Sequence, residues 1–141
     1  MRTYLLLISL LISIKTFSSP FAVYDTIPYW KVYNGGKLLS EGNFTNQNTI
    51  LITKHHVRAI DTMTVEYYED VRCINCNAEM IVKTNAGKEI KKIKNAGNVY
   101  LFKIKATEIQ VLAANNRSEI LKFYIKKNKG TEVLLFQIRI Q

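Results

Sequence analysis

Residues 120–141 read ILKFYIKKNKGTEVLLFQIRIQ, and their alternation indicates two adjacent β-strands. In the first half the apolar residues are Leu121, Phe123 and Ile125, and the intervening residues are Lys122, Tyr124 and Lys126. In the second half the apolar residues are Leu134, Phe136, Ile138 and Ile140. A period of two is typical of a strand with one face buried. The polar link 127–130 ends in glycine and predicts a hairpin between the two strands.

The same pattern recurs upstream and predicts an all-β domain. Short apolar runs occupy residues 29–33, 38–41, 49–54, 63–68, 78–84 and 99–105. Asn- and Gly-containing turns separate many of them, and the two Asn-Ala-Gly turns that flank residues 88–94 predict a lysine-rich hairpin. This spacing favours a single antiparallel β-sandwich of about eight to nine strands, Ig-like or jelly-roll-like, with a closed β-barrel as the alternative.

Residues 107–116 fit two structures. Ile109 and Val111 suit a strand, which is the prediction adopted here. Thr107 and Gln110 also fit a helix capping box, and Ile109, Leu112 and Ala113 would then share one helical face. The fold class is all-β in either case.

The first residues have the layout of a secretion signal. Arg2 precedes an apolar run over residues 4–14, and small residues surround position 18. The run is about half of the ~20 residues that a membrane-spanning helix needs. We therefore expect a signal peptide at residues 1–19, cleavage between Ser18 and Ala22, and one β-sandwich domain at residues 20–141. The destination would be the medium, the periplasm or the cell envelope, with no transmembrane segment after cleavage.

The chain is basic, with 20 Lys and Arg against 11 Asp and Glu and a net charge of +9. Loss of Arg2 and Lys15 with the leader would leave 18 against 11, or +7. Such an excess favours acidic partners, and candidate polyanion-binding residues cluster late in the chain. They are Lys88, Lys91, Lys92, Lys94, Lys103 and Lys105, and Lys122, Lys126, Lys127 and Lys129 could extend the same surface. The alternative is that these lysines protect exposed strand edges from pairing with other chains.

Cys73 and Cys76 form a Cys-x-x-Cys motif. In an oxidising compartment we expect a local structural disulfide that closes a turn between two strands. Metal binding and thiol exchange are the alternatives, but a zinc site needs two further ligands. The adjacent His55 and His56 would point to opposite faces of a strand, so at most one could join a shared metal. We assign no catalytic role to them and predict neither a metal nor a cofactor.

Aromatic residues near the start suggest a second surface. Tyr29 and Tyr33 would share one face of a strand, and Trp30 would take the other face and enter the core. Tyr24, Tyr29 and Tyr33 could stack against sugars, although ordinary strand packing also explains these tyrosines.

The sequence thus predicts an exported, non-enzymatic binding or structural module. Its basic face would contact an acidic polysaccharide, a glycolipid or a protein partner, and secretion makes nucleic acid a poor candidate. The alternatives are a carbohydrate-binding domain that uses the tyrosines, and a thiol or metal protein centred on Cys73 and Cys76. The sequence does not indicate an oligomeric state.

Overall fold

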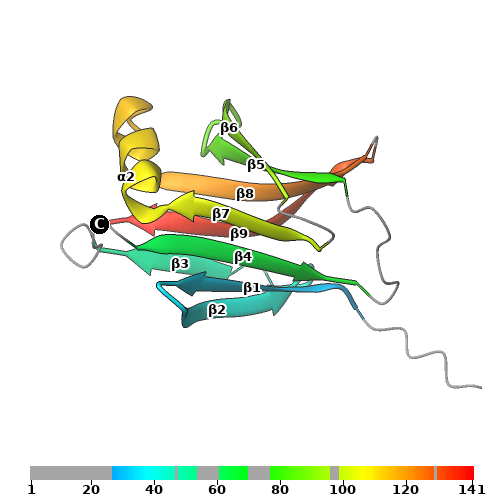
Figure 1. The fold of residues 1–141 in the computed structure, drawn as a ribbon. Helices are drawn as coiled ribbons and strands as arrows, with labels where there is room; N and C mark the ends of the chain where they lie inside the picture. The colour runs from blue at the N-terminus through cyan, green and yellow to red at the C-terminus, as the bar shows by residue number, and fades with distance from the viewer. Residues whose placement is uncertain (1–26, 47, 54–60, 70–76, 96–98, 129) are drawn as a thin grey trace, which may run out of the picture.

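Nine strands and one helix make up the part of the chain that the computed structural model describes, which is residues 27–46, 48–53, 61–69, 77–95, 99–128 and 130–141 (Figure 1). The strands are β1 (Tyr29–Asn34), β2 (Lys37–Asn43), β3 (Asn48–Ile52), β4 (Thr62–Tyr68), β5 (Ala78–Thr84), β6 (Glu89–Lys94), β7 (Leu101–Lys105), β8 (Ile120–Lys127) and β9 (Glu132–Ile140). The helix is α2 (Ala106–Asn115). The chain is therefore mostly β, as predicted. Several predictions fall outside the described residues and stay predictions. They concern the signal peptide expected at residues 1–19, Tyr24, His55, His56, Cys73 and Cys76.

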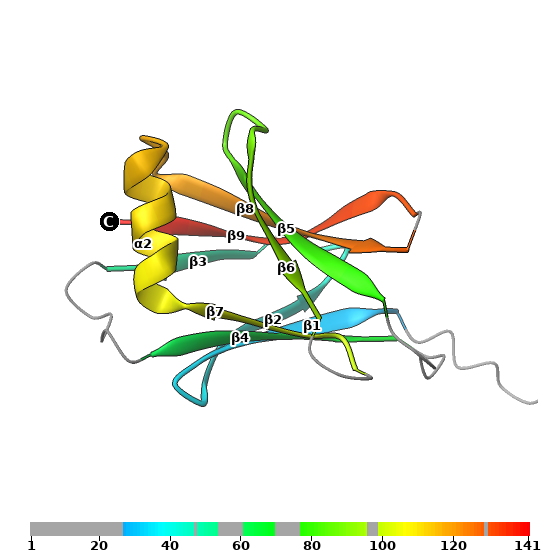
Figure 2. The ribbon, with the colours of Figure 1, turned by 45° about the horizontal axis from the view of Figure 1, so that its top comes forward.

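The strands form two sheets, and in the described residues neither closes into a barrel. The four-stranded sheet has the order β2-β1-β4-β7, and the five-stranded sheet has the order β3-β9-β8-β5-β6. Edge strands β6 and β7 lie side by side, one from each sheet (Figure 2). The barrel alternative is therefore wrong for the described residues, and the two-sheet expectation is confirmed.

The predicted hairpins form where turn residues permit them. The β1–β2 turn has positive φ at Gly35 (55°) and Gly36 (83°), the combination that a two-residue type I′ turn requires. β8 and β9 also pair antiparallel, as predicted. The alternation predicted for the second strand is wrong at Leu134, because a register shift opposite Phe123 and Tyr124 places Leu135 in the core and Leu134 opposite the outward Tyr124. Local turn chemistry therefore accounts for the β1–β2 hairpin.

One pairing departs from the prediction, because β3 runs parallel to β9. The chain leaves β2 in the four-stranded sheet and enters β3 in the five-stranded sheet. No tight turn sets the direction of a strand that arrives from the other sheet. The prediction of a purely antiparallel arrangement is therefore wrong at this edge.

The core lies between the sheets. Trp30 of β1 is fully buried, and its ring centroid lies 5.2 Å from that of Phe136 on β9, which joins the two sheets. Phe136 in turn stacks on Phe123 of β8, with centroids 4.7 Å apart. The predicted core position of Trp30 is confirmed, and so is the inward face of β8.

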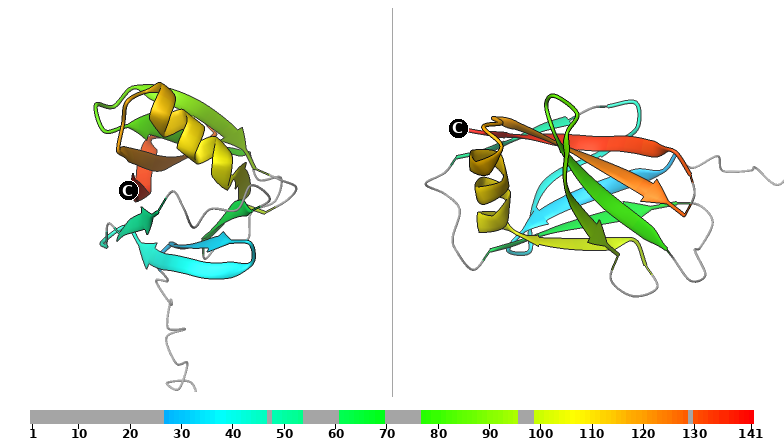
Figure 3. Two further views of the ribbon diagram at one scale, coloured as in Figure 1. Left: turned by 90° about the vertical axis from the view of Figure 1, so that its left-hand side faces the viewer. Right: turned by 90° about the horizontal axis from the view of Figure 1, so that it is seen from above.

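Helix α2 lies at one end of the strands, and it corrects the strand predicted for residues 107–116 (Figure 3). Its residues Ile109 and Ala113, four apart, belong to the buried core. A helix places residues at this spacing on one face. A strand would instead have put Ile109 and Val111 on the same face, but Val111 is exposed. In the described residues no helix has the length and apolar character needed to cross a membrane.

Candidate functional site

The outer face of the five-stranded sheet gathers basic residues from four strands. On β8 the buried residues Leu121, Phe123 and Ile125 alternate with Lys122, Tyr124 and Lys126, which therefore point away from the core. The pairing register then places residues of β5, β6 and β9 on the same side. We call this set the lysine face. Its members are Glu79, Ile81, Lys83, Glu89, Lys92, Lys94, Lys122, Tyr124, Lys126, Glu132, Leu134, Gln137 and Arg139.

An apolar row runs across the middle of the lysine face. Ile81 pairs with Lys92 on one side and with Tyr124 on the other, and Tyr124 pairs with Leu134. Ile81 is only 1% exposed although it lies outside the core cluster. Long lysine side chains can cover apolar surface with their stems and keep the ammonium group in water. The stems of the surrounding lysines can therefore pack on this apolar row.

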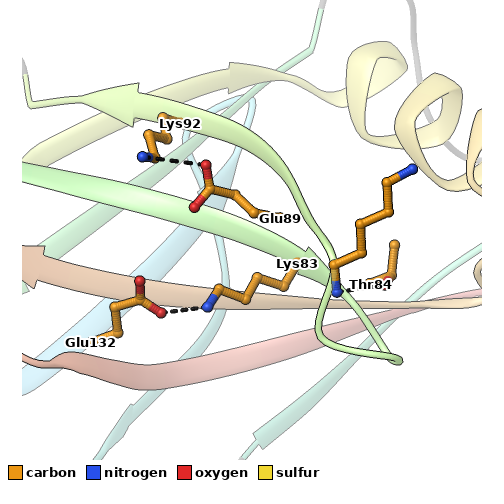
Figure 4. Close-up of polar contacts among 6 residues, drawn as sticks. Lys83, Thr84, Glu89, Lys92 and Glu132 are labelled. Carbon is orange, nitrogen blue, oxygen red and sulfur yellow. Dashed lines mark hydrogen bonds and ion pairs between the residues drawn. The ribbon is translucent and has the colours of Figure 1, made fainter.

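Two ion pairs lie on the lysine face (Figure 4). Lys83 of β5 reaches over β8 to Glu132 of β9, and its Nζ also lies 5.2 Å from the centroid of the Tyr124 ring. The hydrogen bond to Glu132 raises the pKa of Lys83, so this amine stays charged. Lys92 pairs with Glu89 along β6, with Nζ and Oε1 3.3 Å apart.

The other cations of the lysine face have no ion pair among the described residues. These four are Lys94, Lys122, Lys126 and Arg139. Lys122 lies directly opposite Lys83, and like charges in that position repel. The lysine face contains six cations and three carboxylates, so it has an excess of positive charge.

The six predicted polyanion-binding lysines are divided by the fold. Lys92 and Lys94 lie on the lysine face. Lys91 pairs with Val82, so it lies on the inner side of β6, and its Nζ is 2.7 Å from Oε1 of Glu108 on α2. Lys88 donates a hydrogen bond to Asn116 Oδ1 at 3.3 Å, near the end of the helix.

The last two predicted lysines lie on the other sheet. Lys103 and Lys105 of β7 pair with Thr64 and Thr62 of β4 and point away from the core. The predicted set is therefore divided between the two sheets. Sequence reasoning missed Lys83, Tyr124 and Arg139 as members of the lysine face. The period-two pattern that places Lys122 and Lys126 outward also places Tyr124 there, and this signal could have identified it.

The two described candidate tyrosines meet a third that the sequence did not suggest. Tyr29 and Tyr33 share the outer face of the four-stranded sheet, as predicted. Tyr68 of β4 lies directly opposite Tyr29, and the two rings stack with centroids 4.6 Å apart and planes 10° apart. Tyr68 could be found only from the pairing of β1 with β4.

A cavity of about 620 Å³ opens at the end of the strands near α2. Its lining mixes apolar side chains with Asn34, Lys37, Thr53 and Asp61. The Oδ1 atom of Asn34 has no hydrogen-bond partner in the described residues. Because this atom is fully buried, a molecule in the cavity could not reach it. Within the described ranges, no cluster of His, Cys, Asp or Glu could hold a metal ion.

Comparison with known proteins identifies no relative of this chain. No family model, no curated protein and no solved structure matches it.

Proposed function

We propose that this protein is an exported, non-enzymatic binding module whose lysine face binds an acidic polysaccharide of the cell envelope or its surroundings. One observation carries the proposal. The strand register gathers Lys92, Lys94, Lys122 and Lys126 around Tyr124 on one outer face. Export follows from the leader predicted at residues 1–19, and it is part of the proposal. We also propose, at the finer level, an Ig-like or jelly-roll-like sandwich, which the division into two open sheets supports.

The spacing of the charges suits an extended anion. β6 and β8 flank β5, so their lysines are two strand spacings apart, or about 10 Å. A chain of acidic sugars that lies across the strands would meet the lysines of β6 first and those of β8 next. Tyr124 stands beside the second pair and offers an aromatic ring to the sugar backbone between the acidic groups.

The partial neutralisation of the lysine face favours a polysaccharide over a compact, highly charged ligand. Glu79 lies between Lys94 and Lys126 in the register, and Glu132 holds Lys83. These carboxylates would repel an anion centred on them, but they leave Lys94, Lys122 and Lys126 without ion pairs among the described residues. Separated acidic groups on a long chain can contact such separated cations.

Two double variants with the same net charge test the proposal on immobilised heparin. Lys122→Gln with Lys126→Gln removes two cations from the lysine face. Lys103→Gln with Lys105→Gln removes two cations from the outer face of the other sheet. We expect the wild type to elute with rising salt because screening weakens the attraction, and the first variant to elute at clearly lower salt than the second. Equal shifts of the two variants, or retention that ignores ionic strength, would contradict the proposal.

A further inference from the structure

The outer face of the four-stranded sheet carries exposed aromatic rings in a fixed arrangement. Tyr29 and Tyr68 are 42% and 37% exposed, and they stack nearly parallel. Tyr33 lies further along β1 on the same face. Stacking already restricts the rotation of both rings. A ligand that binds here would therefore lose little affinity to the ordering of these two side chains.

Two exposed aliphatic residues lie in the segments next to β1 and β4. Ile27 lies two residues before Tyr29 and is 55% exposed. Val99 is 59% exposed, and the hydrogen bond from Tyr67 N–H to Tyr100 O (3.0 Å) sets the segment before β7 alongside the end of β4.

A polar row lies next to the aromatic pair. Lys31 of β1 is opposite Glu41 of β2 and Glu66 of β4. Alternate residues of a strand share a face, so this row is about 7 Å from the stacked rings. It offers one ammonium donor between two carboxylate acceptors.

The charged groups of this polar row already have partners within the protein. Lys31 Nζ lies 3.7 Å from Glu41 Oε2 and 5.8 Å from the centroid of the Tyr29 ring. The Tyr68 hydroxyl donates a hydrogen bond to the Glu66 carboxylate. This bond raises the pKa of Tyr68, so the phenol remains a protonated donor. The row holds one ammonium and two carboxylates, so its net charge of −1 does not attract an anion, and its oxygen and nitrogen atoms suit a neutral ligand that forms hydrogen bonds.

We propose that this tyrosine face, defined by Tyr29, Tyr68, Lys31, Glu41 and Glu66, is a second binding site and holds a neutral sugar unit. A sugar ring has an apolar side that suits the stacked tyrosines and hydroxyl groups that suit the adjacent polar row. A stable protein partner would bury about 800 Å² on each side and would need a larger surface than these side chains provide. The site is independent of the lysine face, because the two lie on the outer faces of different sheets.

Isothermal titration calorimetry with cellohexaose, xylohexaose, mannohexaose and chitohexaose tests this inference. We expect at least one of these neutral oligosaccharides to bind, with an affinity that stays the same between about 0.1 and 0.5 M NaCl because the ligand is uncharged. Tyr29→Ala and Tyr68→Ala should each weaken binding about tenfold, in line with the loss of one aromatic contact. Val111→Ala removes an exposed apolar side chain from α2 and is the control, which should bind as the wild type does.

Two further measurements separate binding from folding. Tyr68→Phe keeps the ring and loses only the hydrogen bond to Glu66, so it should retain most of the affinity. Circular dichroism should show the same spectrum for every variant. Failure of all four oligosaccharides to bind would overturn the inference, as would equal losses in Val111→Ala and Tyr29→Ala. A change of oligomeric state in Tyr29→Ala by light scattering would instead make the surface a protein interface and would also overturn it. None of these results bears on heparin binding by the lysine face.

Discussion

At the scale of single residues, the buried ring of Trp30 explains why position 42 is a glycine. A Cβ atom added at Gly42 would lie 2.7 Å from Cζ2 of Trp30, which is fully buried. We expect Gly42→Ala to reduce the free energy of unfolding by about 1–3 kcal/mol, because the Trp30 ring would have to shift in a packed core. Urea denaturation measures this difference. The control is Leu38→Ala on the same strand, which is exposed and should change stability by no more than about 0.5 kcal/mol. Equal stability of Gly42→Ala and the wild type would show that the ring does not fill this space.

The buried phenol of Tyr67 predicts a loss of stability at high pH. Burial raises the pKa of Tyr67 above its ordinary value of 10.0, and the nearby carboxylate of Glu69 raises it further. The folded state therefore holds this proton where the unfolded state releases it, and stability falls as the pH rises above 10. We expect the free energy of unfolding of Tyr67→Phe to decline less steeply in that range. Urea titrations at a series of alkaline pH values make the comparison, and parallel curves for the two proteins would contradict the assignment.

Some residue positions followed from the sequence and others did not. The inward position of Trp30 and the shared face of Tyr29 and Tyr33 depend only on alternation along one strand, so they were predictable. The contact between Tyr29 and Tyr68 depends on the pairing of β1 with β4. That pairing joins strands that no tight turn connects, so local patterns do not contain it.

At the scale of elements, helix α2 begins without a side-chain cap. Its N-cap residue is Lys105, which makes no capping hydrogen bond. We expect Lys105→Asp to stabilise the protein by about 1 kcal/mol, because a carboxylate there can accept a hydrogen bond from the first turn and favours the positive end of the helix. The control is Lys103→Asp, which makes the same charge change two residues earlier in β7. A thermal unfolding midpoint that rises equally in both variants, or in neither, would contradict this explanation.

The wrong prediction for residues 107–116 has a physical cause. Ile109 and Val111 fit a strand by local preference, but burial decided the outcome. The helix places Ile109 and Ala113 in the core and leaves Val111 exposed. The parallel pairing of β3 was beyond sequence reasoning for a similar reason. Thr49 of β3 and Gln137 of β9 are hydrogen-bonded across 88 positions of the chain.

At the scale of the whole molecule, the fold decides what the net charge of +9 means. The composition predicted a basic surface but not its place. The ion pair of Lys91 with Glu108 removes one lysine from it, and Lys103 lies on the outer face of the other sheet from Lys122. What remains is the lysine face, which depends on the register of four strands.

Lysine acetylation followed by mass spectrometry, with and without heparin, tests the lysine face most directly. Bound heparin should protect Lys92, Lys94, Lys122 and Lys126 from the reagent, because they share one outer face. Lys103 and Lys105, on the other sheet, should react as fast with heparin as without it. Equal protection of the lysines on both sheets, or protection confined to Lys103 and Lys105, would contradict the assignment of polyanion binding to the five-stranded sheet.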